Sequence, residues 1–335
     1  MIEFSIARGS ILRLREPLNL KILIVGQGSA GSRYVRDAIS LGHEPGVVTR
    51  RGKGPHGEIF HADGLVEGIR LFSPDAVVVA TETARHVSDC VVAMDAGLSV
   101  LVEKPLAMSA AEAAPVFTHR GSGQVFVAHP LRFSSSLRAM REAIQSAGGV
   151  VYGTFICGQH LEDWRPARDY RSTYSASKSK GGGVVLDLIH EIDALQWLVG
   201  LPHEVVSTEH NSMSLETDSE QFSGSLFRWH GGGTAVLVLD YLRRPRAREY
   251  VVVTETATFR WSMASWSAAR SDSGGTRTLA VDESSPSVHV RMLSGFIDAV
   301  RGEPSLLATP EDAQKSLRLV DAMKSSVRLR RWVTL

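Results

Sequence analysis

Apolar and polar positions follow two different patterns along this chain, and the change between them divides it into two regions. In the first region, segments with helical spacing separate short apolar runs at residues 21–25, 46–49, 74–80, 99–102 and 125–128. This alternation predicts buried parallel strands joined by helices, which is typical of a doubly wound nucleotide-binding domain. Among the connecting helices we expect one at 32–41 and another ending near residue 96.

A helix predicted over residues 134–147 marks the change of pattern. Beyond it, strand-like segments follow one another at residues 150–159, 205–209, 221–229, 234–240, 249–254 and 256–261. With no helices between the last five, they predict an antiparallel or mixed sheet. The stretch 262–286 is rich in Ser, Gly and Arg and is expected to be exposed. Helices are expected again at 292–301 and at 310–326, the second after Thr309 as N-cap.

The segment GGGVVLDLIHEIDALQWLVG, residues 181–200, has unusual polar positions in an otherwise apolar pattern. Its apolar spacing predicts one helix, on which Asp187, His190 and Asp193 recur every three residues and form a ridge on one side. Buried titratable groups generally pair with one another or meet a ligand. The ridge is therefore a candidate site, with helix capping and surface contacts as the alternative.

A glycine-rich turn directly follows the first apolar run. The sequence there is Gly26-Gln-Gly28-Ser29-Ala30-Gly31. In a strand–turn–helix context, a GxGxxG motif predicts a dinucleotide site: the glycines allow a tight turn, close approach of a pyrophosphate and close helix packing. The N–H groups at the helix start would hold the phosphates.

The second apolar run ends in Thr49, Arg50 and Arg51. A site specific for NAD places Asp or Glu here to accept from the ribose 2′-hydroxyl. A hydroxyl and two guanidiniums suit a 2′-phosphate instead. We therefore favour NADP(H), with NAD(H) possible.

Polar residues also follow the later strands, at the edge where open α/β sheets bind ligands. Thr81 begins the loop after the strand at 74–80, and His86 opens the next helix, where it caps, packs or touches cofactor. Glu103, Lys104 and Pro105 follow the strand at 99–102. We predict that Lys104, fixed by the adjacent proline, points toward the nicotinamide.

A polar, aromatic loop at residues 164–177 precedes the 181–200 segment. Such a loop can stack on a sugar ring and bind hydroxyls, carboxylates or phosphates, unless it is an exposed loop without a ligand. The candidate substrate-binding residues are Trp164, Arg165, Asp169, Tyr170 and Tyr174, joined by Arg132 and Asp193.

Composition narrows the function classes. The 37 basic and 36 acidic residues give a net charge of +1, which does not favour nucleic acid or an anionic membrane as partner. Cys90 and Cys157 lack any zinc-binding spacing and predict reduced, buried thiols in a cytoplasmic protein. We expect neither a signal peptide nor a metal site.

The chain resembles the glucose–fructose oxidoreductase/inositol dehydrogenase/rhizopine-catabolism (Gfo/Idh/MocA) family in its glycine motif, its Glu-Lys-Pro element and its Gly-Gly-Gly segment with the Asp and His that follow. The resemblance implies an α/β fold in two domains. These are a Rossmann domain over 1–133, with 1–19 as an extension, and an α+β domain over 134–335 with a large open, mainly antiparallel sheet. That sheet implies a homodimer or homotetramer. The loop at 164–178 is similar to a narrower subgroup that accompanies biosynthesis of sialic-acid-like sugars and surface polysaccharides.

The resemblance also implies reversible oxidation of a secondary hydroxyl on a sugar or cyclitol. His190 would be the general acid–base, Lys104 would stabilise charge on the reacting oxygen, and Asp187 would position the substrate or the imidazole. Family members often place the histidine four residues after the aspartate, whereas here it follows by three. Asp193 is thus an alternative partner for His190. A non-catalytic NAD(P)-binding sensor on the same fold is the alternative function.

Overall fold

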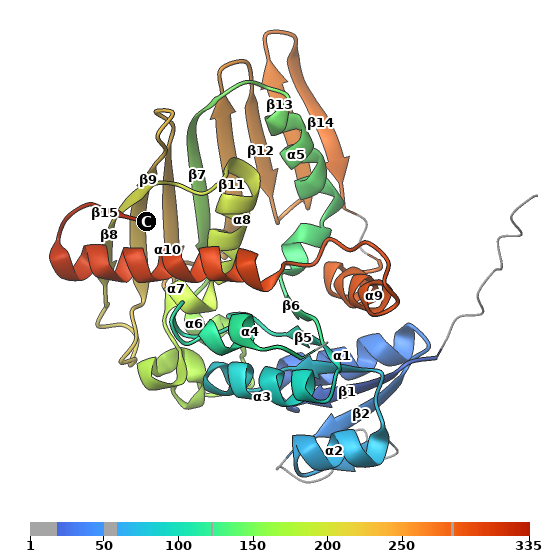
Figure 1. Cartoon of the computed structure of the whole chain (residues 1–335). Helices are drawn as coiled ribbons and strands as arrows, with labels where there is room; N and C mark the ends of the chain where they lie inside the picture. Colours follow the sequence, from blue (N-terminus) through green and yellow to red (C-terminus); the bar gives the residue numbers. More distant parts are fainter. Residues whose placement is uncertain (1–18, 50–58, 122, 283–284) are drawn as a thin grey trace, which may run out of the picture.

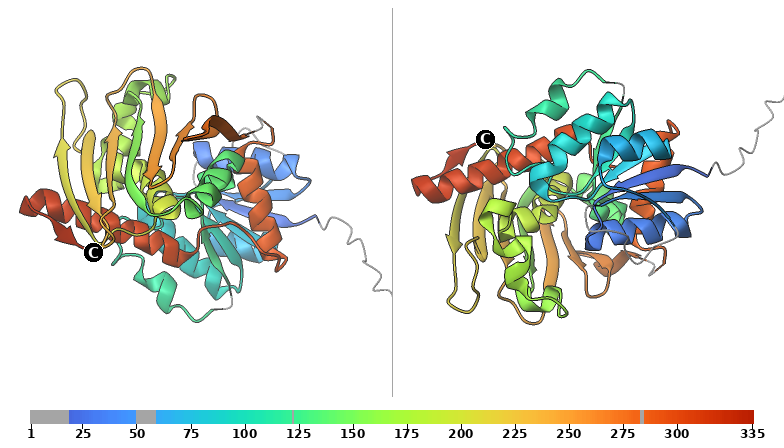
Figure 2. Two further views of the ribbon diagram at one scale, coloured as in Figure 1. Left: turned by 90° about the horizontal axis from the view of Figure 1, so that it is seen from above. Right: turned by 90° about the horizontal axis from the view of Figure 1, so that it is seen from below.

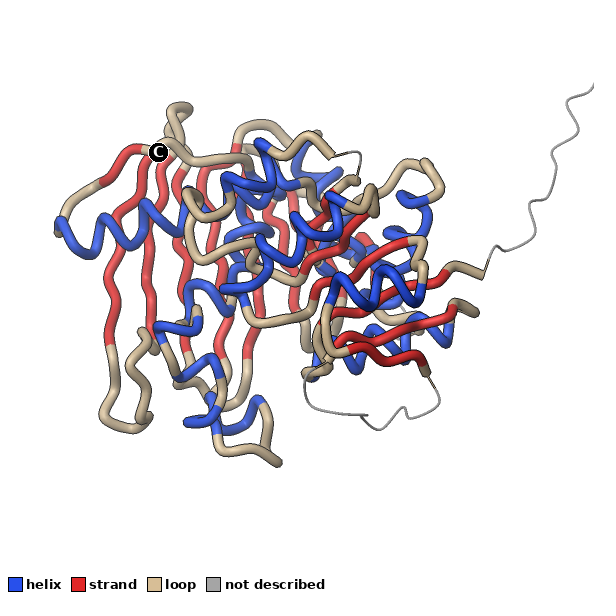
Figure 3. The backbone as a smooth tube through the Cα atoms, turned by 60° about the horizontal axis from the view of Figure 1, so that its bottom comes forward, coloured by secondary structure: helices blue, strands red, loops and turns tan. Residues whose placement is uncertain are grey.

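The protein is described by a computed structural model at residues 19–49, 59–121, 123–282 and 285–335, and these residues form two separate sheets (Figure 1; Figure 3). In this part of the chain no helix is both long and apolar enough to cross a membrane.

The first sheet is parallel, with the order β3-β2-β1-β4-β5-β6. Its strands are β1 (Lys21–Val25), β2 (Glu44–Val48), β3 (Phe60–Ala62), β4 (Ala76–Val79), β5 (Ser99–Val102) and β6 (Val125–Val127). The connecting helices are α1 (Ser29–Ser40), α2 (Leu65–Phe72), α3 (Thr83–Asp95) and α4 (Ala114–Thr118). The doubly wound arrangement predicted from the alternating pattern is confirmed, and its strand order changes direction between β1 and β4.

The second sheet has nine strands, in the order β14-β13-β12-β11-β7-β10-β9-β8-β15. Their bounds are β7 (Val150–Gly158), β8 (Glu204–His210), β9 (Phe222–Arg228), β10 (Thr234–Asp240), β11 (Ala247–Thr254), β12 (Thr258–Ser262), β13 (Ser267–Asp272), β14 (Gly275–Val281) and β15 (Val333–Thr334). Strands β7 and β10 pair in parallel, and the other neighbours are antiparallel. The mainly antiparallel sheet is therefore confirmed.

Two of these strands, β13 and β14, lie in the stretch 262–286, for which we predicted exposure and no strands. Strand β13 places Ala268 in the core, while β14 at the sheet edge is largely exposed. An edge strand such as β14 is held by backbone hydrogen bonds to its one neighbour. Because its side chains are largely exposed, it needs few apolar residues. Its polar composition therefore resembled that of a loop.

Helices α5 (Ser135–Gln145), α8 (Ile189–Val199) and α10 (Pro310–Leu329) pack against this second sheet (Figure 1; Figure 2). The predicted cap of α10 is confirmed: the Thr309 side chain accepts from the Asp312 N–H, and Asp312 accepts from the Thr309 N–H in a capping box.

Helix α9 (Val288–Val300) packs with the first sheet instead of the second. Its apolar side chains Met292, Leu293 and Phe296 lie in one cluster with Ile22 and Tyr34. The sequence assigns residues 134–335 to the second domain, and α9 lies within that range. The chain instead returns to cover the first sheet, which sequence order alone does not reveal.

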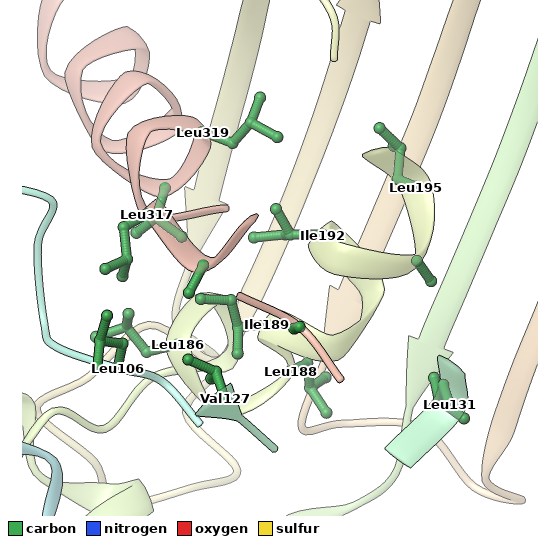
Figure 4. Packing of buried hydrophobic residues seen from close by; sticks show 14 of the residues in the cluster. Leu106, Val127, Leu131, Leu186, Leu188, Ile189, Ile192, Leu195, Leu317 and Leu319 are labelled. Carbon is green, nitrogen blue, oxygen red and sulfur yellow. The ribbon is translucent and has the colours of Figure 1, made fainter. Parts of the chain in front are cut away.

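The two parts share an apolar core around α8. Side chains of Leu186, Ile189 and Ile192 lie beside Leu317 of α10 and Val127 of β6 (Figure 4). All five are almost fully buried. This packing fixes α8 against both sheets, so the polar residues on α8 are held at the junction between them.

Candidate active site

The predicted single helix at 181–200 is broken in two. Helix α7 (Val184–Asp187) ends at Asp187 with Leu188 as its C-cap, and α8 begins at Ile189. Gly183 precedes α7 with a φ of 110°, and a Cβ there would lie 2.2 Å from the Glu220 Oε1 atom, so only glycine fits. Because the helix breaks, Asp187, His190 and Asp193 do not form one continuous ridge.

A cavity of about 800 Å³ lies at this break. Its wall combines the glycine-rich turn, the ends of the first-sheet strands, the loop that follows β7, and α8. Of the residues predicted to bind cofactor or to act in catalysis, it is lined by Gly26, Gly28, Ser29, Ala30, Thr49, Thr81, His86, Glu103, Lys104, Asp187 and His190. The volume is of the size typical for ligand sites.

The glycine-rich turn fits a dinucleotide. Gly28 is the N-cap of α1 without a capping side chain, and a Cβ on it would meet no atom within 4 Å. A Cβ on Gly31 would lie 1.9 Å from the Gly26 carbonyl oxygen, so the turn packs tightly under the helix start. Free N–H groups facing a cavity at a helix N-terminus suit a pyrophosphate.

The ribose end of the predicted cofactor site is described in part. Thr49 lines the cavity, together with Asp63, which follows β3. Arg50 and Arg51 lie outside the described residues. Sequence reasoning missed Asp63 because β3 is only three residues long and was not predicted.

The Glu-Lys-Pro element links the two domains at the cavity. Lys104 Nζ donates to the Asp187 carbonyl oxygen at 2.6 Å and lies 3.8 Å from the Asp187 Oδ1 atom. Glu103 accepts from Arg33 at 2.9 Å and from the Tyr34 hydroxyl at 3.0 Å. The lysine is thereby directed across the interface toward α7.

His86 is buried behind this element. Its Nδ1 atom lies 2.7 Å from the Pro105 carbonyl oxygen, and its Nε2 atom lies 3.1 Å from the Thr81 carbonyl oxygen. Burial lowers the pKa of His86. Its ring therefore braces the loops after β4 and β5, and Pro105 contributes through its carbonyl group.

The Asp187 carboxylate is held by two tyrosine hydroxyls. Tyr174 donates to Oδ1, and Tyr241 of the loop after β10 donates to Oδ2 at 2.6 Å. Burial, reinforced by the Asp187 charge, raises the pKa of both tyrosines. They stay protonated and keep donating, so each carboxylate oxygen is already engaged without His190.

His190 lines the cavity and is partly buried. Burial lowers its pKa well below the usual value, and the positive charge of Lys104 adds to this effect. The ring is thus neutral at pH 7 and able to act as a base. Its Nδ1 atom lies 3.4 Å from the Nδ1 atom of His129, a residue that sequence reasoning did not select.

Arg132 and Asp193 lie outside the cavity lining, although we expected them to contact substrate. Arg132 donates to both Asp193 oxygens, from Nε at 3.0 Å and from Nη2 at 2.7 Å. Its Nη1 atom donates to Asp312 at 2.8 Å. Both members of the Arg132–Asp193 pair are buried, so it ties the segment after β6 to α8 and α10.

The loop predicted to bind substrate is split between two surroundings. Trp164, Arg165 and Tyr174 line the cavity. Asp169 is exposed and pairs with Arg171 at 3.2 Å, whereas Tyr170 is buried and its hydroxyl accepts from the Glu216 N–H. The loop folds as three short 3₁₀ turns, which direct successive side chains differently.

Other lining residues were not identified from the sequence. They include Gln27, Arg33, Glu82, Thr83, Arg85, Lys180 and His289, while Arg168, Ser172 and Thr173 belong to the predicted loop without having been named individually. His289 enters from α9, where burial lowers its pKa to about 4. His129 does have a sequence feature that could have identified it, because it follows β6 as Lys104 follows β5.

Comparison with known proteins agrees with this geometry. Residues 20–129 match the model of the oxidoreductase family with an NAD-binding Rossmann fold, and residues 137–260 match the GFO/IDH/MocA C-terminal domain. Over 149 residues, 41% of this chain, it is 34% identical to 1,5-anhydro-D-fructose reductase of Ensifer adhaerens. The matched segment spans only 42% of that relative.

Two further matches cover more of the chain. D-glucoside 3-dehydrogenase of Escherichia coli is 25% identical over 284 residues, covering 76% of this chain and 77% of the relative. The WlbA dehydrogenase from Bordetella pertussis, solved with NADH and UDP-GlcNAcA, superposes with a TM-score of 0.78 at 18% identity. The superposition covers 95% of this chain and 99% of the other, and at that identity it shows a shared fold.

Proposed function

Because the chain belongs to the GFO/IDH/MocA oxidoreductase family, we propose that it catalyses reversible oxidation of a secondary hydroxyl on a sugar-type substrate with a nicotinamide cofactor. When bound, the nicotinamide supplies or accepts the hydride. The observation that carries the proposal is that Lys104 and His190 share one cavity with the glycine-rich turn.

The protein's own groups divide the remaining work. His190, neutral at pH 7, takes the hydroxyl proton during oxidation and returns it to the oxygen during reduction. Lys104, held at 2.6 Å by the Asp187 carbonyl, donates a hydrogen bond to the reacting oxygen as negative charge develops there. Asp187 orients Lys104 and Tyr174, while its two tyrosine partners fix its own position.

The substrate side of the cavity supports a sugar that carries a carboxylate or phosphate. Trp164 and Tyr174 offer flat aromatic surfaces for a sugar ring. Arg165 and Arg168 of the same loop, and Lys180 just after it, add three cations. Among the described ion pairs none involves Arg165, Arg168 or Lys180, so these cations are available to an anionic group.

For the cofactor, we propose NADP(H) in preference to NAD(H). The proposal rests on the Arg50–Arg51 pair after β2. Asp63 in the cavity wall is the feature that would favour NAD(H).

The self-association expected from the family resemblance stays a prediction. Exposed Val151 and Tyr152 on β7, and Val236 on β10, are compatible with it.

The test is to incubate purified protein with NADP⁺ or NAD⁺ and a panel of neutral and anionic sugars and sugar nucleotides, and to follow absorbance of the reduced nicotinamide. Lys104→Ala and His190→Ala should each lower turnover about 10²-fold or more. His119→Ala is the matched control, because His119 pairs with Asp95 outside the cavity lining. Cofactor binding without turnover on any substrate would favour the sensor, and near-normal turnover in either variant would remove that residue from the mechanism.

A further inference from the structure

A line of buried polar side chains runs from the cavity wall into the protein behind His190. The His190 Nδ1 atom lies 3.4 Å from the His129 Nδ1 atom. The same His129 nitrogen lies 3.6 Å from the Asp193 Oδ2 atom, and Arg132 holds Asp193 with two hydrogen bonds. Neither Asp187 nor Asp193 is therefore the direct partner of His190. His129 lies between His190 and Asp193.

His129 is placed firmly enough to act as such an intermediary. It directly follows β6, its side chain is 2% exposed, and its carbonyl group accepts from the Arg132 N–H at 3.2 Å. The two imidazole rings stand nearly perpendicular, at 87°. Since η1 (Pro130–Phe133) begins at the next residue, the short segment that carries His129 also carries Arg132.

We propose that His129 is a positioning residue through which Asp193 decides which nitrogen of His190 carries hydrogen. This inference rests on the proposed role of His190 as general acid–base. Asp193 thereby acts on catalysis indirectly. His129 acts through its contact with His190 and does not itself line the cavity.

The argument begins with the number of hydrogens. Burial lowers the pKa of both histidines, so both rings are neutral near pH 7 and each has one N–H. Two Nδ1 atoms that face each other at 3.4 Å interact favourably only if one donates and the other accepts. The hydrogen on one ring therefore dictates the hydrogen on the other.

Asp193 determines whether the Nδ1 atom of His129 or that of His190 carries the hydrogen. Burial alone would raise the pKa of this carboxyl, but the charge and the hydrogen bonds of Arg132 hold it below its usual range, so it is ionised at pH 7. A carboxylate 3.6 Å from the His129 Nδ1 atom attracts a hydrogen on that nitrogen. His129 is then the donor, the His190 Nδ1 atom is the acceptor, and the hydrogen of His190 lies on Nε2.

Other charges around the two rings change the proton affinity of each ring as a whole. Lys104 after β5, Arg248 of β11 and His289 of α9 lower the pKa of His190 from three sides. Arg132 and Lys104 lower the pKa of His129, while Asp193 and Glu103 raise it. Asp193 is the carboxylate within 4 Å of the His129 Nδ1 atom among the described ion pairs.

The arrangement has a chemical consequence. With hydrogen on Nε2, the neutral His190 ring can donate a hydrogen bond to a ketone oxygen. It can deliver that proton only when Nδ1 gains one, because a neutral ring has a single N–H. In oxidation the substrate O–H bond breaks as an Nε2–H bond forms, and the electron pair leaves carbon with the hydride to the nicotinamide. That step needs a free Nε2 lone pair, so His190 must first carry its hydrogen on Nδ1 and His129 must become the acceptor. The resting pair therefore favours the ketone-bound form.

The test measures the ring hydrogens directly, by long-range ¹H–¹⁵N correlation spectra of the full chain without cofactor near pH 7. The His190 signals are assigned with His190→Gln. We expect Nε2–H in the unaltered protein. We expect a shift to Nδ1–H in Asp193→Asn, because the amide can donate to His129 and turn it into an acceptor. An amide in place of the carboxylate of a catalytic triad likewise changes which nitrogen of the histidine carries hydrogen.

The decisive comparison repeats Asp193→Asn in a His129→Phe background, where the tautomer of His190 should no longer respond. His129→Phe alone should move the His190 Nδ1 resonance toward that of an unbonded acceptor, with partial recovery in His129→Gln, whose amide can donate. His119→Phe, which removes the histidine paired with Asp95, should leave the His190 signals unchanged.

Three outcomes would overturn the inference. They are an Nδ1–H tautomer of His190 in the unaltered protein, a response to Asp193→Asn that persists without His129, and a His190 Nδ1 signal unmoved by His129→Phe. The last measurement needs no change at Asp193, so it holds even if Asp193→Asn does not fold. Because the spectra need no substrate, failure of the proposed enzyme activity would be recognised separately.

Discussion

The Arg132–Asp193 pair offers a strong quantitative test of the structure, because the sequence pointed to substrate binding and the structure points to a buried ion pair. The three side-chain hydrogen bonds of Arg132 described above all go to carboxylates, two to Asp193 and one to Asp312. Replacing it with methionine keeps an apolar stem of similar length and leaves the Asp193 carboxylate buried at 1% exposure without its guanidinium.

The magnitude follows from the burial. Breaking a buried ion pair from one side costs about 3–5 kcal/mol, because an uncompensated charge stays in the interior. Here we expect about 3 kcal/mol, since His129 can still offer a hydrogen to Asp193 from 3.6 Å and Asp312 is partly hydrated. Arg132→Met with Asp193→Leu removes both charges, so the double variant should lose less than the sum of the single variants by about 1–3 kcal/mol.

The assay is urea unfolding of the four proteins in this cycle, followed by tryptophan fluorescence, with steady-state kinetics on each. The KM for substrate should change less than about threefold in Arg132→Met, because Arg132 does not line the cavity. An unchanged unfolding midpoint together with a strongly raised KM would refute the structural reading and return Arg132 to the substrate site.

Three further outcomes are expected. Arg50→Ala with Arg51→Ala should weaken NADPH binding far more than NADH binding, measured by fluorescence titration, and equal losses would exclude a 2′-phosphate contact. Arg168→Gln should lower kcat/KM about 10- to 100-fold on anionic sugars and little on neutral ones, as expected for a lost charge-assisted hydrogen bond. Arg171→Gln is the matched control, because the Arg171 guanidinium pairs with Asp169 and Glu216, and it should change kcat/KM for neither kind of sugar. The pKa of His190 is lowered, so its neutral, basic form persists below pH 6.5. A plot of kcat/KM for oxidation against pH should therefore lose activity only at a pH well below 6.5. Loss of activity already at or above pH 6.5 would contradict this.

The sequence was sufficient for features that depend on neighbouring residues. The run at 21–25 and the glycine motif after it determine a strand, a turn and a helix start, because hydrophobic period and glycine conformation are local properties. The position of Lys104 after its strand also followed from sequence, since in a parallel sheet strand ends meet at one edge. His190 entered as a candidate through the family resemblance and its place in the 181–200 segment.

Tertiary structure decided what distant segments do to one another. The close approach of Glu220 to Gly183 joins residues far apart in sequence, and the return of α9 to the first sheet depends on apolar packing across the chain. The partner of His190 is His129, which lies 61 residues earlier in the sequence, while the nearby Asp187 and Asp193 are engaged by tyrosines and by Arg132. Local pattern selects which residues are polar within a core, but their hydrogen-bond partners are set by which elements the fold brings within about 3–4 Å.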